Sequence, residues 1–188
     1  MTGPLHGLIL GGQKSGKSRL AEQRAAAWLA VPGRRATLVA TALAGDAEMA
    51  RRIARHQADR AARVPGLATL EEPVDLAGAI RRHSAPGHLL VVDCLTLWLT
   101  QRLMPLQGVG LDDKDLAAAT TALLAALQQA PGPVLWVSNE IGLGISPLGA
   151  EVRRFLDALG LLHQQIAGLC GQVQLVVAGC PLTVKGSP

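Results

Sequence analysis

The chain has 188 residues and 49% of them are hydrophobic, yet it holds only three Trp, one Phe and no Tyr. This length predicts a single domain, residues 1–188, with a core of aliphatic side chains. The net charge of +4 comes from arginines spread without interleaved aromatic residues, which favours phosphate handling over nucleic-acid binding. Three cysteines without metal-ligand spacing indicate neither a disulfide framework nor a zinc site, and suit the cytoplasm. Neither a signal peptide nor a membrane-spanning run is expected.

Short apolar runs alternate with stretches of helix-forming residues along the whole chain. Strands are expected at residues 5–10, 36–41, 67–70, 88–92, 134–138 and 173–178. Helices are expected at 17–29, 46–63, 74–83, 112–129 and 147–169, with a loop at 104–110 and a frayed tail after Gly179. This alternation predicts an α/β fold, a three-layer sandwich with a mostly parallel sheet. Sites in such sheets lie at the carboxyl ends of the strands.

Residues 11–18, GGQKSGKS, fit the Walker A pattern between an expected strand and an expected helix. The glycines let backbone N–H groups surround phosphate oxygens at the positive end of the helix. Lys17 is expected to neutralise the outer phosphates and Ser18 to ligate Mg²⁺. The sequence therefore predicts a P-loop NTPase, RecA-like, with these phosphate-binding residues: Gly11, Gly12, Gln13, Lys14, Ser15, Gly16, Lys17 and Ser18.

Two later strands end in polar residues. The run at 89–92 followed by Asp93 has the Walker B form, and Asp93 is expected to hold Mg²⁺ opposite Ser18. The strand at 134–138 ends in the segment Ser138-Asn139-Glu140, which fits either a polar site or an ordinary turn between strand and helix.

The helix at 46–63 carries two stripes at helical spacing, with Asp46 as a plausible cap. One stripe consists of alanines small enough to lie close on a neighbour, at positions 47, 50, 54, 58 and 61. The other consists of Met49, Ile53, His56 and Arg60. On periodicity alone, a histidine in such a stripe is an ordinary surface or boundary residue. With Arg52, Arg55 and Arg60 around it, an anionic substrate can be held there, and His56 then becomes a candidate nucleophile at phosphorus.

Together these stretches resemble the bifunctional adenosylcobinamide kinase / adenosylcobinamide-phosphate guanylyltransferase family of cobalamin biosynthesis. The resemblance spans nearly the whole chain in family order. It rests on GGxxSGKS at 11–18, DxEMxxRIxxHxxxR at 46–60, TxExP at 69–73, VDCLTLW at 92–98, SNEIGxGIxP at 138–147 and LVVAG at 175–179.

The resemblance implies two reactions. ATP or GTP phosphorylates the hydroxyl of adenosylcobinamide, and GMP then passes from GTP through a guanylylated histidine to give adenosylcobinamide-GDP. It makes Lys17 and His56 the catalytic residues. It adds further residues around the nucleotide: Ala40, Thr41, Ala42, Gln57, Ala58, Asp59, Arg60, Glu71 and Asp93. It also implies a homotrimer, with adenosylcobinamide and its phosphate bound at a subunit boundary.

The chain departs from the family pattern at Leu67, where Trp is frequent, at Leu156, where Arg is usual, and at His163, where Asn is usual. If these positions touch the corrinoid or the trimer partner, details of both differ from the family, while the nucleotide chemistry is unaffected. Two other functions are consistent with the motifs alone. One is a monofunctional P-loop kinase of a small alcohol, with His56 structural. The other is a RecA-like motor, which the short chain and the absence of a nucleic-acid surface disfavour.

Overall fold

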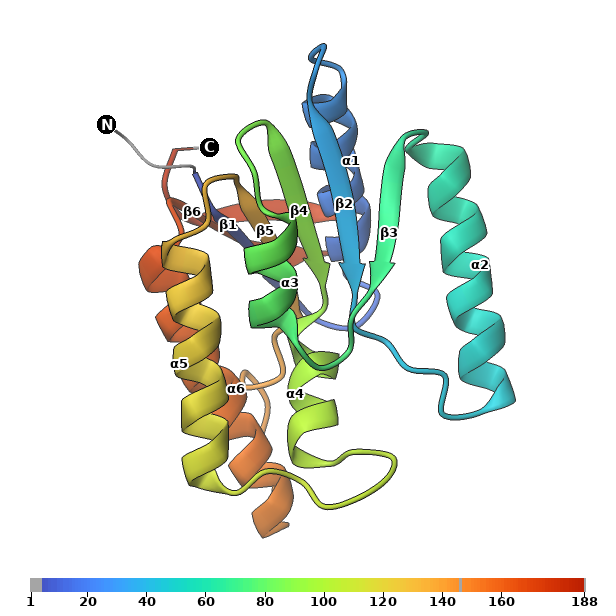
Figure 1. Cartoon of the computed structure of the whole chain (residues 1–188). Helices are drawn as coiled ribbons and strands as arrows, with labels where there is room; N and C mark the ends of the chain where they lie inside the picture. Colours follow the sequence, from blue (N-terminus) through green and yellow to red (C-terminus); the bar gives the residue numbers. More distant parts are fainter. Residues whose placement is uncertain (1–4, 146, 188) are drawn as a thin grey trace.

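The computed structural model describes residues 5–145 and 147–187, and its centre is a seven-stranded sheet (Figure 1). The strand order is β3-β2-β4-β5-β1-β6-β7, with every pair parallel except β6 and β7. The strands are β1 (Gly7–Gly11), β2 (Arg35–Ala40), β3 (Leu67–Glu71), β4 (His88–Asp93), β5 (Val134–Asn139), β6 (Gln172–Val177) and β7 (Cys180–Lys185).

Helices cover both faces of the sheet, which confirms the predicted three-layer α/β fold (Figure 1). The helices are α1 (Lys17–Leu29), α2 (Ala47–Arg63), α3 (Leu76–His83), α4 (Leu95–Leu103), α5 (Asp113–Gln128) and α6 (Ala150–Leu169). Helices α3 to α6 lie on one face, α1 lies on the other, and α2 stands beside the edge strand β3. In the described part of the chain, no helix combines the length and the apolar character needed to cross a membrane.

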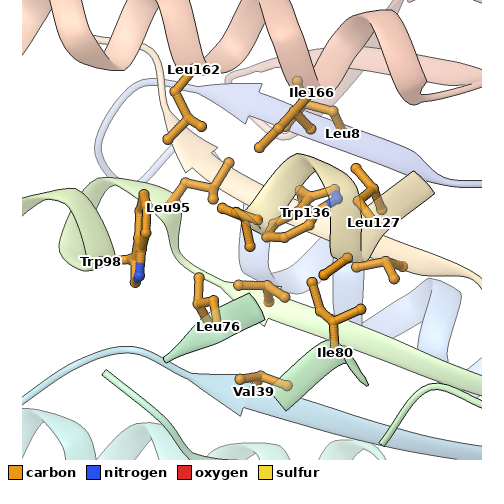
Figure 2. Packing of buried hydrophobic residues seen from close by; sticks show 14 of the residues in the cluster. Leu8, Val39, Leu76, Ile80, Leu95, Trp98, Leu127, Trp136, Leu162 and Ile166 are labelled. Atoms are coloured by element: carbon orange, nitrogen blue, oxygen red, sulfur yellow. The ribbon is translucent and has the colours of Figure 1, made fainter. Parts of the chain in front are cut away.

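Alternate residues of the central strands belong to two separate apolar clusters, one on each face of the sheet. In β4, Leu90 and Val92 face α3 to α6, whereas Leu89 and Val91 face α1. The larger cluster gathers around Trp136 of β5 (Figure 2). Because both faces of these strands are covered, each strand is a continuous apolar run rather than an alternating one.

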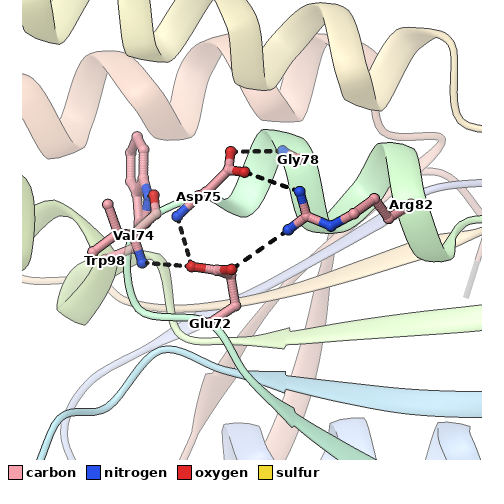
Figure 3. A network of polar contacts seen from close by, with 6 residues as sticks. All are labelled: Glu72, Val74, Asp75, Gly78, Arg82 and Trp98. Atoms are coloured by element: carbon pink, nitrogen blue, oxygen red, sulfur yellow. Dashed lines mark hydrogen bonds and ion pairs between the residues drawn. The ribbon is translucent and has the colours of Figure 1, made fainter.

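The loop between β3 and α3 is held by a polar network (Figure 3). Asp75 caps α3 by accepting a backbone N–H at 2.8 Å, and Arg82 from the end of that helix donates to Asp75 at 3.2 Å. The Glu72 carboxylate accepts the backbone N–H of Asp75 at 2.8 Å. The indole N–H of Trp98 in α4 donates to a carbonyl of the same loop at 2.8 Å. The network therefore fixes the start of α3 against α4.

Two elements were not predicted from the sequence. Helix α4 follows Asp93 directly, and β7 pairs antiparallel with β6 through a two-residue turn at Ala178 and Gly179, whose φ angles are 50° and 81°. The expectation of a frayed tail after Gly179 is therefore wrong. Helices α3 and α6 begin two and three residues later than expected, at Leu76 and Ala150.

The alanine stripe of α2 does not pack on a neighbour, which corrects the prediction made for it. All five alanines are exposed, and Ile53, Gln57 and Arg60 form the half-buried face instead. Polar contacts, not alanine packing, hold this helix to the rest of the chain. The side chains of Met49 and Arg52 lie outside the described part of the structure.

Replacing Leu127, which is fully buried between α5 and the sheet, should test the core directly. We expect Leu127→Ala to lower the free energy of unfolding by roughly 2–5 kcal/mol, from lost burial and a residual cavity. Leu161→Ala on α6, where the side chain is 60% exposed, serves as control. It should change the free energy of unfolding by less than about 0.5 kcal/mol. Equal losses in urea titrations of the two variants would contradict this packing.

Candidate active site

The loop between β1 and α1 has the backbone that a phosphate cradle needs. Gly11, Lys14 and Gly16 have positive φ angles, of 156°, 56° and 105°. A Cβ added at Gly11 would lie 2.5 Å from the carbonyl oxygen of Val176, so a larger residue does not fit there without moving the sheet. Helix α1 begins without a side-chain cap, which leaves the N–H groups of its first turn available to an anion.

Lys17 lies buried at the base of this loop. Its ammonium donates a hydrogen bond to the carbonyl oxygen of Gly12 at 2.6 Å, so the lysine closes the loop upon itself. Burial lowers the pKa of Lys17, and the negative charge of Asp93 opposes that shift. Within the described residues, the Ser15 hydroxyl is buried without a hydrogen-bond partner. An unsatisfied hydroxyl and a buried cation fit a phosphate group between them.

Asp93 ends β4 and reaches the same edge of the sheet. Burial raises the pKa of Asp93, whereas a hydrogen bond from Ser18 and the charges of Arg60 and Lys17 lower it. The Ser18 hydroxyl and the Asp93 carboxylate offer the oxygen ligands that Mg²⁺ prefers. No group of three or more His, Cys, Asp or Glu arranged for a metal occurs in 5–145 and 147–187. This donor set fits an ion that takes most of its ligands from phosphates and water.

Thr41 also lies at this edge, but its side chain is already occupied. Its hydroxyl donates to the carbonyl of Cys94 at 2.8 Å and accepts the Cys94 N–H at 2.7 Å, and it is fully buried. Thr41 therefore fixes the end of β2 to the start of α4. Ala40 pairs in register with both Asp93 and Glu71, so these three residues share one edge of the sheet.

Helix α2 holds two of its predicted residues against β3 and leaves three exposed. Gln57 donates to Glu71 at 3.2 Å and Arg60 donates to Thr69 at 3.3 Å, so both lie against β3. The side chains of His56, Ala58 and Asp59 are exposed. The structure thus brings the loop residues, Ser18 and Asp93 together, but it shows no contact between His56 and the phosphate loop.

A buried polar network at the end of β5 was not predicted as a site. Ser138 is fully buried, and its hydroxyl lies 3.1 Å from the Thr96 hydroxyl and 2.7 Å from Nε2 of His163 in α6. Nδ1 of His163 lies 3.8 Å from the Glu140 carboxylate. Two sequence signals pointed here, namely the polar Ser138-Asn139-Glu140 segment and the unusual histidine at 163. Only the folded structure shows that these two segments lie next to each other.

Comparison with known proteins decides the family. Residues 7–184 match the family described as "Cobinamide kinase / cobinamide phosphate guanyltransferase". The chain belongs to this family. It is 49% identical over 182 residues to the "Bifunctional adenosylcobalamin biosynthesis protein CobP" of Pseudomonas aeruginosa, covering 96% of this chain and 98% of that protein. It is 33% and 34% identical to the CobU proteins of Escherichia coli and Salmonella typhimurium, covering 95% of this chain and 98% of each relative.

Solved structures of distant sequence share the fold of this cobinamide kinase family member. A protein from Pyrococcus horikoshii aligns over the whole chain and 89% of its own length, with a TM-score of 0.56 and 7% identity. The flagellar accessory protein FlaH of Methanocaldococcus jannaschii aligns over the whole chain and 80% of its own length, with a TM-score of 0.51 and 10% identity. Both support the α/β architecture alone.

Lys17→Met should weaken nucleotide binding at least about tenfold, because the buried ammonium is the charge that we expect to meet the phosphates. The affinity is measured by titration with a fluorescent GTP analogue. Lys114→Met, at an exposed position of α5, removes the same charge far from the loop and should leave the affinity unchanged. The unfolding midpoints of both variants are measured as well, so that a loss of affinity caused by misfolding can be recognised. If the unaltered protein and both variants bound the GTP analogue equally well, Lys17 would not be a phosphate-binding residue.

Proposed function

We propose that this family member phosphorylates adenosylcobinamide with ATP or GTP and then transfers GMP from GTP, through a guanylylated His56, to give adenosylcobinamide-GDP. The observation that carries the proposal is the joint placement of the phosphate loop and Asp93 at one edge of the sheet. This edge belongs to a chain that matches the kinase / guanyltransferase family over residues 7–184.

Phosphoryl transfer draws on the loop and Lys17. The N–H groups of the loop and of the first turn of α1 would hold the phosphates, and Lys17 would leave the Gly12 carbonyl for a phosphate oxygen. Mg²⁺ held by Ser18 and Asp93 would neutralise charge on the phosphates. Because both reactions need a bound triphosphate, we assign both to this one loop.

Guanylyl transfer needs a nucleophile with a free ring nitrogen, and His56 is exposed on α2. Its helix is held to α1 and β3 by Arg63, Arg60 and Gln57. His56 lies one turn before Arg60 on the same helical stripe, and its side chain stays exposed. Arg63 donates to the buried carboxylate of Glu22 at 2.8 Å, which anchors the C-terminal end of α2 to the helix that begins at the phosphate loop.

The remaining residues of the nucleotide site are proposals of the same kind. They are Gly11, Gly12, Gln13, Lys14, Ser15, Gly16, Ala40, Thr41, Ala42, Gln57, Ala58, Asp59, Arg60 and Glu71. For Thr41, the contact would come from its backbone, because its hydroxyl is bonded to Cys94. The family match does not favour the alternative, a monofunctional kinase with a structural His56.

We further propose a homotrimer in the cytoplasm. Exposed apolar side chains between β5 and α6 support association, since Leu143 is 81% and Leu148 is 97% exposed. All three cysteines are free, which suits a reducing compartment.

His56→Asn should abolish covalent labelling of the protein by [α-³²P]GTP and the formation of adenosylcobinamide-GDP, because the amide cannot form the phosphoramidate. The label is read after denaturing electrophoresis, as acid-labile and alkali-stable radioactivity. His83→Asn, at the end of α3, is the matched control and should label as the unaltered protein does. Labelling that persists in His56→Asn would place the nucleophile elsewhere.

Asp93→Asn should raise the Mg²⁺ concentration needed for half-maximal turnover by about tenfold or more, since the ion loses a charged partner. Nucleotide affinity measured without metal should change much less. The two quantities are compared by Mg²⁺ titration of the kinase reaction and by binding in EDTA. An unchanged Mg²⁺ requirement would make Asp93 a strand terminus with no part in metal binding.

A further inference from the structure

The hydroxyl groups of Thr96 and Ser138 and the ring of His163 form one continuous chain of contacts. Thr96 Oγ1 accepts the backbone N–H of Asn139 at 2.9 Å and lies 3.1 Å from the Ser138 hydroxyl. The Ser138 hydroxyl lies 2.7 Å from Nε2 of His163, and Nδ1 of the same ring faces the Glu140 carboxylate at 3.8 Å. A neutral His163 with its proton on Nδ1 can accept from Ser138 at Nε2 and direct its N–H toward Glu140.

This chain of contacts has the order of a Ser-His-acid triad, but Ser138 cannot attack a substrate. Its side chain is fully buried beneath α4 and α6. The carboxylate of Glu140 is the end of the network that reaches solvent, with 22% of the side chain exposed. Any chemistry in this network therefore takes place at Glu140.

Glu140 lies beside the phosphate loop because of the strand order. Strand β5 is placed between β4, which ends in Asp93, and β1, which ends in Gly11. Asn139 pairs in register with Gly11, and the N–H of Glu140 donates to the Gly11 carbonyl at 2.9 Å. Gly142 donates its N–H to one oxygen of the Glu140 carboxylate at 2.7 Å, which leaves the other oxygen toward His163.

Transfer of a phosphoryl group to an alcohol needs a group that takes the hydroxyl proton. Among the described residues at the ends of β1, β4 and β5, the carboxylates are Asp93 and Glu140. Asp93 accepts a hydrogen bond from Ser18, and its proposed role is to hold Mg²⁺. We propose that Glu140 accepts the proton of the substrate alcohol in the phosphoryl-transfer step, and that His163 is a positioning residue that orients its carboxylate. This inference rests on the proposed kinase function.

In this step the alcohol oxygen forms a bond to the γ-phosphorus. The bond from that phosphorus to the β,γ-bridging oxygen breaks, and its electron pair leaves with the nucleoside diphosphate. The alcohol proton passes to the Glu140 carboxylate and then to water. Burial lowers the pKa of His163, and Glu140, the charged group that acts on it, opposes that shift. Protonated His163 would pair with Glu140 as an ion and reduce its basicity. Because the pKa of His163 is lowered, kinase activity should fall only at a pH below the ordinary histidine value of about 6.5.

The test measures single-turnover phosphorylation of adenosylcobinamide with [γ-³²P]GTP between about pH 5.5 and 8.5, in the intact protein. Glu140→Gln keeps the acceptor for Gly142 and should slow phosphorylation by about 10²–10⁴-fold. Covalent labelling by [α-³²P]GTP, which involves no alcohol, should persist in it. Glu151→Gln, at an exposed position of α6, is the matched control and should phosphorylate at the normal rate.

Two variants of His163 separate positioning from simple structural support. Asn can accept from Ser138 and donate toward Glu140, so His163→Asn should keep most of the rate at pH 8 but lose the acid limb of the profile. His163→Leu should lose rate at every pH, with GTP labelling as the check on folding. A rate within twofold of normal in Glu140→Gln, or an unchanged acid limb in His163→Asn, would overturn the proposal. No phosphorylated cobinamide from the unaltered protein would overturn the kinase function as well.

Discussion

The buried ammonium of Lys17 and the carboxylate of Asp93 set the constraint on which the site depends. Each is taken out of water at the same sheet edge, which lowers the pKa of Lys17 and raises that of Asp93. Lys17 binds the loop's own Gly12 carbonyl and Asp93 accepts from Ser18. In the proposed function, a triphosphate and a metal ion would supply the charges that these two groups lack.

The strand order decides which residues surround this pair of charged groups. Inserting β5 between β4 and β1 separates Asp93 from the phosphate loop by one strand and places Ser138, Asn139 and Glu140 between them. The same arrangement brings α6 over the end of β5, where His163 meets Ser138. The proposed nucleophile His56, in contrast, belongs to a helix attached by polar contacts at the edge of the sheet.

The sequence predicts most of the fold because apolar runs and helix formers alternate clearly along it. The placement of the glycine-rich loop between β1 and α1, and of Asp93 at the end of β4, also follows from contiguous residues. Their roles in binding phosphate and metal stay predictions. Helix α4 was not predicted, because LTLWLTQRL is apolar on several sides and lacks a helix start signal after Asp93. Strand β7 was not predicted because it is exposed throughout, contains Pro181 and follows a turn with Ala178 at positive φ, where Gly or Asn is usual.

Sequence alone could not predict the polar network at the end of β5, which consists of Thr96, Ser138, Glu140 and His163. Its members are brought together only by the packing of α4 and α6 on the sheet. The exposed alanines of α2 show a different limit of prediction from sequence. Their helical spacing correctly indicated a helix, but periodicity cannot say which stripe faces the protein when polar contacts at Glu22, Thr69 and Glu71 decide the orientation.

The central claim is that one phosphate loop, completed by Asp93, serves both reactions. A crystal structure with Mg²⁺ and a non-hydrolysable GTP analogue tests it most directly. It should show one triphosphate per chain in the loop of residues 11–18, with Lys17 moved from the Gly12 carbonyl to a phosphate oxygen and the ion between Ser18 and Asp93. A triphosphate bound elsewhere, or a second one bound beside His56 with its own metal, would contradict the claim.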